Sequence, residues 1–299
     1  MQVFLQQLVN GVAWGGVYAL IALGYTMVYG VLRLINFAHG DVFMFGAFMA
    51  YYGARALGPR SETPLGAAAI IVFAIVASAV LGMLIERLAY RPVRKHSRLT
   101  ALITAIGVSL FLENAGQQIF GKDPHSFPAL FGTAPPIRWG EVYISRTSIY
   151  ILVCASALLA GLQLIVRRTK FGKAMRAISQ DPTASALMGI HTDRVISMTF
   201  ALGSALAAAA GILVATYNSQ IEPLMGMLPG LKAFVAAVLG GIGSIPGAVV
   251  GGMILGLAEV FIGASPLSNY RDAIAFALLV VVLLVRPSGI LGTGMVEKV

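Results

Sequence analysis

Long apolar stretches separated by short charged loops run through the whole chain. The stretches are roughly 17 to 24 residues long, and a helix of about 20 apolar residues spans the hydrocarbon core of a bilayer. The pattern therefore predicts an all-α fold, a polytopic bundle of eight or nine transmembrane helices. The expected spans are residues 8–30, 40–56, 65–88, 99–120, 149–166, 195–217, 228–242, 247–263 and 270–286.

Two of these segments, 40–56 and 228–242, are short for a complete crossing. Short membrane segments interrupted by Gly or Pro are often broken or re-entrant helices that line a path through the protein. We therefore expect short or broken helices at both places. The sequence leaves open whether 228–242 spans fully or returns to its own side.

Basic residues mark two loops as cytoplasmic. One contains Arg91, Arg94, Lys95 and Arg98, and the other, residues 167–194, is also rich in Lys and Arg. Short loops with this excess face the cytoplasm, and the two spans between these loops put both on one side. The charge-balanced segment 121–147 is then external, as is the N-terminus. Nine crossings place the C-terminus inside, whereas a re-entrant segment would reverse that assignment.

Composition agrees with a membrane domain. Of 299 residues, 58% are hydrophobic and 11% are charged, against about 25% charged in soluble domains. No polar linker divides the chain, so we expect a single transmembrane domain over residues 1–299. The net charge of +9 lies in loops beside the spans, which favours membrane orientation over nucleic-acid binding. Residues 1–32 contain no Lys or Arg, so the first span is expected to be retained rather than cleaved as a signal peptide.

The sequence contains no recognisable metal-binding, catalytic or nucleotide-binding motif. The four His residues are isolated, and the single Cys154, expected to pack in an apolar stretch, cannot build a thiolate metal site. The stretch GGIGSIPG lacks the Gly-Lys-Ser/Thr ending of a phosphate-binding loop. We therefore expect no catalytic residues, no metal, no cofactor and no ATPase site on this chain.

Ionisable residues at membrane depth are costly and often functional. Glu113 and Glu259 lie within or near the ends of apolar runs, and Lys232 opens one. A secondary transporter could use such carboxylates as proton or sodium relays. Two further pairs at span ends are expected to reach the interface, because long side chains extend toward water there: Glu86 with Arg87, and Arg271 with Asp272.

The segment Asn36–Asp41 is the densest polar cluster near a span boundary. Asn36 or Asp41 could cap the short second helix, and Asp41 would also meet the positive end of the helix dipole. The alternative is a functional role for Asn36, His39 and Asp41 along a translocation path. The residues themselves leave both roles open.

Small residues recur every fourth position in the second half of the chain. The main series is Gly243, Gly247 and Gly251, and similar series occur at Gly203, Ala207 and Gly211 and at Gly252 with Gly256. Such ridges let membrane helices approach closely. They predict tight helix packing inside one bundle.

The loop 167–194 is too long and too patterned for a tight turn. Asp181 is the expected N-cap and Pro182 the first residue of a short helix that Gly189 ends. A short amphipathic helix pair at the cytoplasmic face either lies on lipid or docks into a groove of a partner protein. The small, flat composition of residues 183–190 favours the protein groove.

Three segments of the chain resemble a known family. Tyr25–Asp41, reading YTMVYGVLRLINFAHGD, resembles the signature near the start of permease subunits of branched-chain amino acid ABC transporters. Arg176–Ile190, RAISQDPTASALMGI, resembles the cytoplasmic coupling segment of that family, and Gly230–Phe261 resembles its glycine-rich late hairpin. The resemblance extends, in order, over nearly the whole chain.

The resemblance implies an inner-membrane subunit that imports branched-chain or related amino acids by alternating access. Implied partners are a second homologous permease, two cytoplasmic ATP-binding subunits and an external, periplasmic substrate-binding protein. The segment 167–194 is then the coupling segment, with Arg176, Asp181, Ala184, Leu187 and Gly189 as coupling residues. The Glu-Ala-Ala opening of many importer coupling loops is replaced here by Arg176-Ala177-Ile178.

The sequence leaves other substrates and other classes of transporter open. The resembled family also includes permeases for urea and short amides, so the substrate is not fixed by it. A proton- or sodium-coupled secondary transporter would work as one chain and would depend on Glu113 or Glu259. A purely structural scaffold is disfavoured, because it does not require broken helices.

Overall fold

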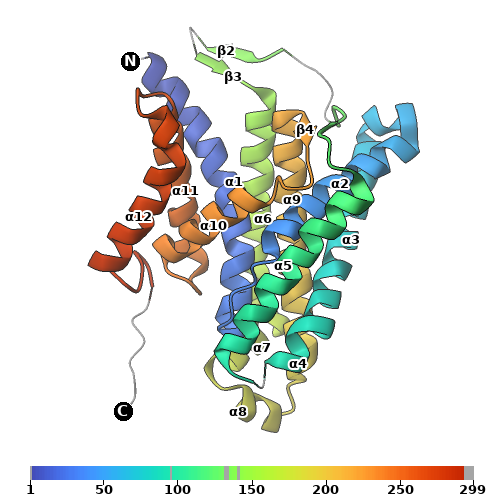
Figure 1. Cartoon of the computed structure of the whole chain (residues 1–299), viewed down its shortest axis with the longest axis vertical. Coiled ribbons are helices and arrows are strands. Elements are labelled where there is room, and N and C mark those ends of the chain that lie inside the picture. Colours follow the sequence, from blue (N-terminus) through green and yellow to red (C-terminus); the bar gives the residue numbers. More distant parts are fainter. Residues whose placement is uncertain (1, 95, 131–134, 140–141, 293–299) are drawn as a thin grey trace.

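The computed structural model describes residues 2–94, 96–130, 135–139 and 142–292. Helices dominate this part of the chain (Figure 1). They are α1 Gln2–Leu32, α2 His39–Leu57, α3 Pro64–Ile85, α4 Arg91–Val93, α5 Arg98–Phe120, α6 Arg146–Arg168, α7 Lys170–Gln180, α8 Pro182–Leu187, α9 Thr192–Asn218, α10 Met227–Gly240, α11 Ile245–Gly263 and α12 Arg271–Val285. A π-helical turn, Glu86–Tyr90, joins α3 to α4.

Short strands form two separate pairs. β1 His125–Ser126 pairs antiparallel with β4 Gln220–Ile221, with His125 opposite Ile221. β2 Ile137–Trp139 and β3 Val142–Ile144 form an antiparallel hairpin with Ile137 opposite Ile144. These pairs order connections between helices and contribute no sheet core, so the predicted all-α class is confirmed.

Seven of the described helical segments are long and apolar enough to cross a membrane. They correspond to seven of the expected spans, with α3 continuing through the π-helical turn to Val93. The other two expected spans are the helices α2, 19 residues, and α10, 14 residues. Neither meets the criteria of length and hydropathy, so these criteria identify seven candidate spans, and the predicted count of eight or nine is not confirmed.

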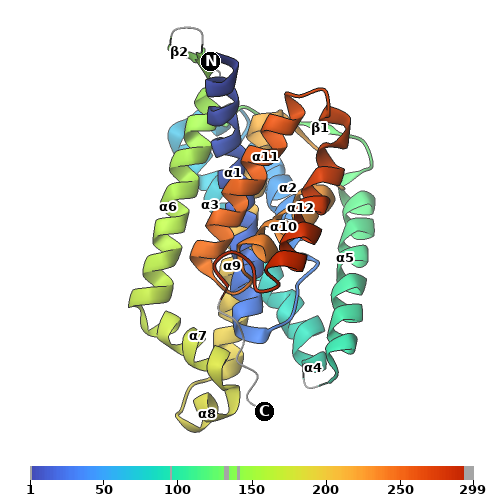
Figure 2. The same cartoon turned by 90° about the vertical axis from the view of Figure 1, so that its left-hand side faces the viewer.

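Helices α1 and α9 form the centre of the bundle. In their most apolar stretches, 83% and 78% of the residues are buried, against 28% or less in α3, α5, α6 and α12. α1 packs along α11, α9, α10 and α6, and α9 also packs along α2 and α3 (Figures 1 and 2). The two helices α1 and α9 are therefore surrounded by other helices and form the core. The outer helices leave one apolar face toward lipid.

The two ends of the bundle differ. Helices α4, α7 and α8 lie together at the lower end, whereas the start of α1 and the hairpin β2–β3 lie at the upper end (Figures 1 and 2). The two basic loops therefore lie on the same side, as their charges predict. The segment after α5 lies on the opposite side.

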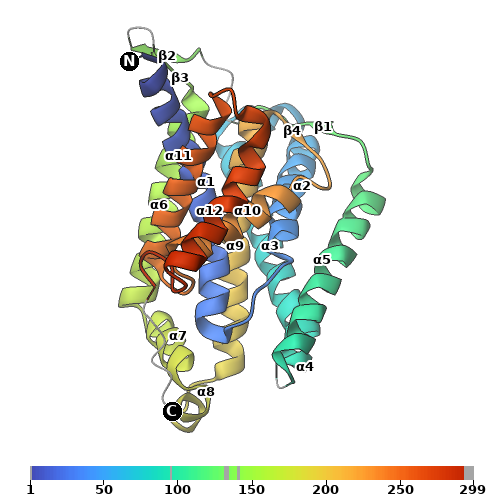
Figure 3. The ribbon, with the colours of Figure 1, turned by 60° about the vertical axis from the view of Figure 1, so that its left-hand side comes forward.

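The short helices α2 and α10 meet at their N-terminal ends near mid-height of the bundle (Figure 3). A Cβ at Gly40 would lie 2.5 Å from the carbonyl oxygen of Gly226, and one at Gly226 would lie 1.9 Å from that of Gly40. Only glycine permits this backbone contact. Two helix starts are thus buried together inside the bundle, as in the broken helices of transporters.

Glycines also bring α11 against two neighbours. A Cβ at Gly247 or Gly251 would lie 2.4 Å from Gly240 O or 2.0 Å from Ala236 O, respectively, both on α10. One at Gly256 would lie 2.2 Å from the backbone nitrogen of Gly15 on α1. Gly243, grouped with Gly247 and Gly251 from its spacing, lies instead in the turn between α10 and α11 with φ of +93°. Its role is conformational, because L side chains rarely adopt that backbone geometry.

Candidate functional site

The segment predicted to couple to an ATPase (residues 167–194, called the coupling segment below) contains two helices, α7 and α8, joined by Asp181. Oδ1 of Asp181 accepts hydrogen bonds from the backbone N–H groups of Thr183, at 2.8 Å, and Ala184, at 2.9 Å. Pro182 is the first residue of α8, and Gly189 follows the helix with φ of +83°. The predicted N-cap and the predicted end of this helix are both confirmed.

Helix α8 projects from the lower end of the bundle with most of its surface uncovered (Figure 2). Leu187 is 84% exposed and Met188 83% exposed, and Ala184 and Gly189 are also exposed. Only Ser185 of this helix is buried, where its hydroxyl donates to the carbonyl oxygen of Asp181 at 2.7 Å. An apolar surface displayed at an aqueous end of a membrane protein is typical of a protein interaction site.

Helix α7 attaches the coupling segment to the bundle. Its apolar residues Met175 and Ile178 are buried in the main core. Arg176, expected to be a coupling residue, donates through Nη1 to the carbonyl oxygen of Val166 in the last turn of α6. The guanidinium thus satisfies a free carbonyl at a helix C-terminus. In this structure its contact is within the chain, while α8 carries the exposed surface.

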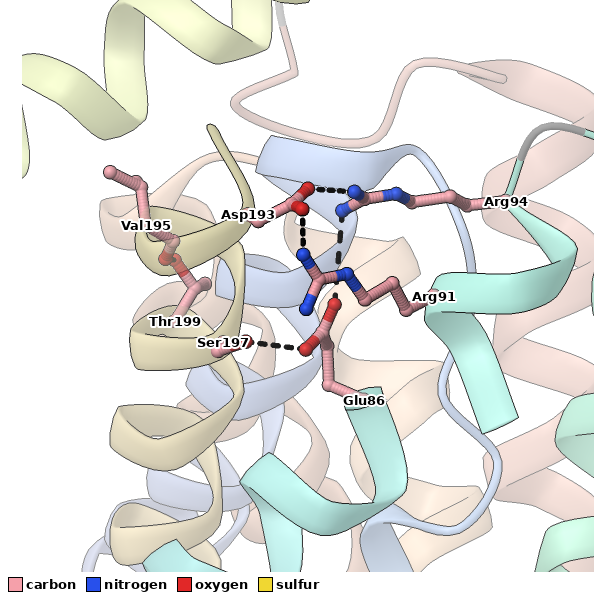
Figure 4. Close-up of polar contacts among 7 residues, drawn as sticks. All are labelled: Glu86, Arg91, Arg94, Asp193, Val195, Ser197 and Thr199. Carbon is pink, nitrogen blue, oxygen red and sulfur yellow. Dashed lines mark hydrogen bonds and ion pairs between the residues drawn. The ribbon is translucent and has the colours of Figure 1, made fainter. Parts of the chain in front are cut away.

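A cluster of charges joins the start of α9 to the π-helical turn and α4, which continue α3 (Figure 4). Asp193, in the first turn of α9, forms ion pairs with both Arg91 and Arg94. Arg94 Nη1 lies 3.8 Å from Glu86 Oε1, and the hydroxyl of Ser197 donates to the same carboxylate. Burial lowers the pKa of the Arg94 guanidinium and the Glu86 carboxylate raises it, but an arginine remains charged at neutral pH.

The position of Glu86 in this ion-pair cluster corrects a prediction. Glu86 was expected to reach the interface beside Arg87, but its side chain is 0% exposed. The π-helical turn that begins at Glu86 displaces the helix from α-helical register, and π-helical turns are frequent at functional sites. Because α9 begins at Thr192, at the end of the coupling segment, the ion pairs of Asp193 link this end of the segment to Arg91 and Arg94.

The residues expected along a translocation path are buried and hydrogen-bonded. Asn36 Oδ1 accepts a hydrogen bond from the Tyr90 hydroxyl at 3.0 Å. His39 Nε2 lies 3.1 Å from the carbonyl oxygen of Ile21, and Ser109 donates to Asp41 Oδ2 at 2.6 Å. The three residues therefore contact three different elements around the start of α2: the π-helical turn, α1 and α5.

The expected capping role is wrong for both Asn36 and Asp41. The N-cap of α2 is Ala38, without a side-chain hydrogen bond. The backbone explains this result, because the carbonyl oxygen of Asn36, and not its side chain, accepts from the N–H of His39. Asp41 does lie in the first turn of α2, at the positive end of the helix dipole.

A second charged cluster lies toward the upper end of the bundle, and the sequence did not show that its members meet. Lys232 Nζ lies 2.7 Å from Glu259 Oε1 and 2.6 Å from Asp272 Oδ1. Arg271 Nε lies 3.3 Å from Glu259 Oε1, and the Tyr18 hydroxyl donates to Glu259 Oε2 at 2.5 Å. Arg271 and Asp272 are 51% and 49% exposed, as expected for side chains at the interface, and they also pair with the buried Glu259 and Lys232.

This upper cluster borders a cavity of about 530 Å³. Besides Lys232, Glu259 and Arg271, the lining includes Trp14, Tyr18 and Leu228. The contributing helices are α1, α9, α10, α11 and α12. Asn36, His39 and Asp41 do not line this cavity. The sequence contains one signal for this cavity, the presence of ionisable residues in apolar runs.

Comparisons with known proteins place these features in a family. The family model described as "Branched-chain amino acid transport system / permease component" matches residues 7–283. The chain belongs to this family. The chain is 46% identical to the high-affinity branched-chain amino acid transport system permease protein LivH of Salmonella typhimurium, covering 99% of this chain and 98% of the relative.

More distant relatives are consistent with that assignment. BraD of Pseudomonas aeruginosa, a permease protein of the same kind of transport system, is 45% identical over 99% of this chain and 98% of its own. A probable LivH of Methanocaldococcus jannaschii is 28% identical over 95% of this chain and 91% of the relative. No solved structure matches the chain significantly. Together with its apolar spans, the family identifies a multi-pass membrane permease.

Proposed function

We propose that this chain is the membrane-spanning subunit of an ABC importer that carries branched-chain or related amino acids across a bacterial inner membrane. The observation that carries the proposal is the exposed apolar surface of α8, displayed by a member of a transport-permease family. This surface suits a groove on a cytoplasmic ATPase. The proposed partners are two such ATPases, a second homologous permease and a periplasmic substrate-binding protein.

The proposed coupling residues divide into two roles. Asp181 and Gly189 define the ends of α8, while Ala184 and Leu187 present its surface to the ATPase. Arg176 holds α7 against the last turn of α6 and so keeps α8 in position. Asn36, His39 and Asp41 are proposed to shape the translocation path from within, by fixing the start of the half-buried helix α2.

Family membership supports this function over a proton- or sodium-coupled secondary transporter. Glu259, which that alternative would use as a relay, is paired with two cations, Lys232 and Arg271. In this structure Glu259 is thus already engaged by cations of the chain itself.

Co-purification tests the proposal directly. When the chain is expressed with its candidate partners and solubilised in mild detergent, we expect two ATP-binding subunits to remain bound. After reconstitution, leucine uptake should require ATP and the substrate-binding protein, and a non-hydrolysable ATP analogue should not support it. The proposal is wrong if the chain retains no ATPase and transports leucine alone in proteoliposomes.

The ion-pair cluster at the start of α9 gives a separate prediction about coupling. Asp193→Asn removes the carboxylate that holds Arg91 and Arg94. Because these pairs are partly exposed, each contributes only about 0–1 kcal/mol to stability, so the complex should still assemble and hydrolyse ATP. We expect leucine uptake per ATP hydrolysed to fall several-fold, because α3 no longer follows α9.

Asp123→Asn is a matched control, since Asp123 is exposed in the segment on the opposite side. Its ratio of uptake to hydrolysis should equal that of the wild type. An unchanged ratio in Asp193→Asn as well would show that the cluster does not transmit movement.

A further inference from the structure

The upper cavity combines charges of both signs with an apolar wall. Lys232, Arg271 and Glu259 line one part of it, and Trp14, Leu224 and Leu228 line another. Its volume of about 530 Å³ lies within the range of about 300–1,000 Å³ found for small-molecule sites. Both the size and the mixture of surfaces therefore suit a small amphiphilic ligand.

The cavity lies toward the side from which an imported substrate arrives. Its lining includes the starts of α10 and α12 and residues next to β4, on the side of the bundle opposite α8 (Figure 1). A solute entering there reaches Lys232 in the second turn of α10, whose start is buried against α2. The charged cluster is thus placed on a route into the bundle.

Structural need alone does not account for these charges. The side chains of Lys232 and Glu259 are 6% and 10% exposed, so both have lost most of their hydration. Replacing buried ion pairs by packed apolar residues is often neutral or stabilising, and small residues already hold α10 against α11. Ionisable groups kept at membrane depth beside an open cavity usually belong to a substrate path.

From this geometry we infer that the cavity is a transit site for a zwitterionic α-amino acid with an aliphatic side chain. Lys232 and Arg271 receive the α-carboxylate, while Glu259 and the Tyr18 hydroxyl receive the α-ammonium group. The aliphatic side chain lies against Trp14 and Leu228. The inference rests on the proposed function and specifies its substrate class, since urea and simple amides carry no charges to exchange with this cluster.

Binding exchanges one set of ion pairs for another. In the empty cavity Lys232 and Glu259 neutralise each other at 2.7 Å. An entering zwitterion supplies an anion for the lysine and a cation for the glutamate, so no charge is left buried without a partner. Because the internal pairs compete with the ligand, affinity stays low and the amino acid is released onward, as conduction through any path requires.

Tryptophan fluorescence reports on the site directly. The sequence contains two tryptophans, so Trp139→Phe leaves Trp14 of the cavity as the single emitter. Leucine added to this full-length variant in detergent should give a saturable change in emission. 4-Methylpentanoate, which lacks the ammonium group, and isoamylamine, which lacks the carboxylate, should require concentrations about tenfold higher or more, because each forms ion pairs with charges of only one sign in the cluster.

Added substitutions separate binding from folding. In the Trp139→Phe background, Lys232→Met and Glu259→Gln should abolish the leucine response. Glu86→Gln, which alters a buried carboxylate of the opposite cluster, should leave the response unchanged. The inference is overturned if leucine gives no saturable change up to its solubility limit, or if all three compounds act alike.

A variant that leaves every charge in place provides the second test, in the assembled and reconstituted transporter. Leu228 is 49% exposed and lines the cavity, whereas Met227, 52% exposed, does not. Leu228→Trp should fill the cavity and lower leucine uptake about tenfold or more, with an unchanged unfolding temperature, while Met227→Trp should transport normally. Normal uptake by Leu228→Trp and Lys232→Met would refute the transit site and leave the proposed function intact; absence of ATP-driven uptake in the wild type would refute the function.

Discussion

Replacing Leu187 with glutamate is expected to detach the ATPase subunits from this permease. Leu187 is 84% exposed at the end of α8 and is proposed to insert into a groove of the ATPase. Burial of a leucine side chain contributes about 1.5–3 kcal/mol, and an unpaired carboxylate buried in its place adds a further penalty. Since each 1.4 kcal/mol is a tenfold change in affinity, a loss of about 100-fold is expected. Pull-down of the ATPase with the tagged permease measures it.

Gln180→Glu is the matched control for this experiment. Gln180 is exposed at the end of α7, so the change adds the same negative charge close to α8 without altering the apolar surface. ATPase binding should stay within about twofold of the wild type, because an exposed charge contributes little. Equal losses in the two variants would indicate general electrostatic repulsion rather than a groove occupied by Leu187.

Replacing Gly256 with leucine is expected to prevent the bundle from forming. A Cβ at this position would lie 2.2 Å from the backbone nitrogen of Gly15 and 2.4 Å from its Cα. These atoms belong to the backbone of α1, so no side-chain rotation relieves the overlap, and α1 must separate from α11. Overpacking typically costs about 1–3 kcal/mol, and displacement of a central helix should exceed that. Size-exclusion chromatography of a fluorescent fusion should show aggregate in place of the monodisperse peak.

Gly161→Leu is the corresponding control in α6. No atom lies within 4 Å of the position that its Cβ would take, so the side chain extends into open space. Leucine has a higher helix propensity than glycine by up to about 1 kcal/mol, and the monodisperse peak should be retained. A folded Gly256→Leu protein would contradict the close approach of α1 and α11.

The coupling segment was predictable because its determinants are local. Asp181, Pro182 and Gly189 act on backbone groups within a few residues, so their types and spacing specify a cap, a first turn and an end. The apolar spans and the side of the two basic loops are likewise encoded in contiguous stretches. Arg176 was less predictable, because its contact with Val166 depends on the angle between α6 and α7.

The two charged clusters could not be predicted from the sequence, because their members lie far apart along the chain. Tyr18 and Glu259 are 241 residues apart along the chain, and Arg91 and Asp193 are 102 apart. Hydrophobic periodicity identifies which residues form a helix but not which helices become neighbours. The prediction that Glu86 reaches the interface failed on this point, because burial depends on the neighbouring helices.

By itself, the sequence determined that this chain is a multi-pass helical membrane protein with two basic loops on one side and a capped short helix between two spans. These properties follow from composition and short-range spacing, to which the bilayer and the helix backbone respond directly. The tertiary structure alone decided that Lys232, Glu259 and Arg271 line one cavity and that Asp193 joins α9 to α3. Those contacts depend on which helices pack together, and glycine contacts between distant segments set that packing.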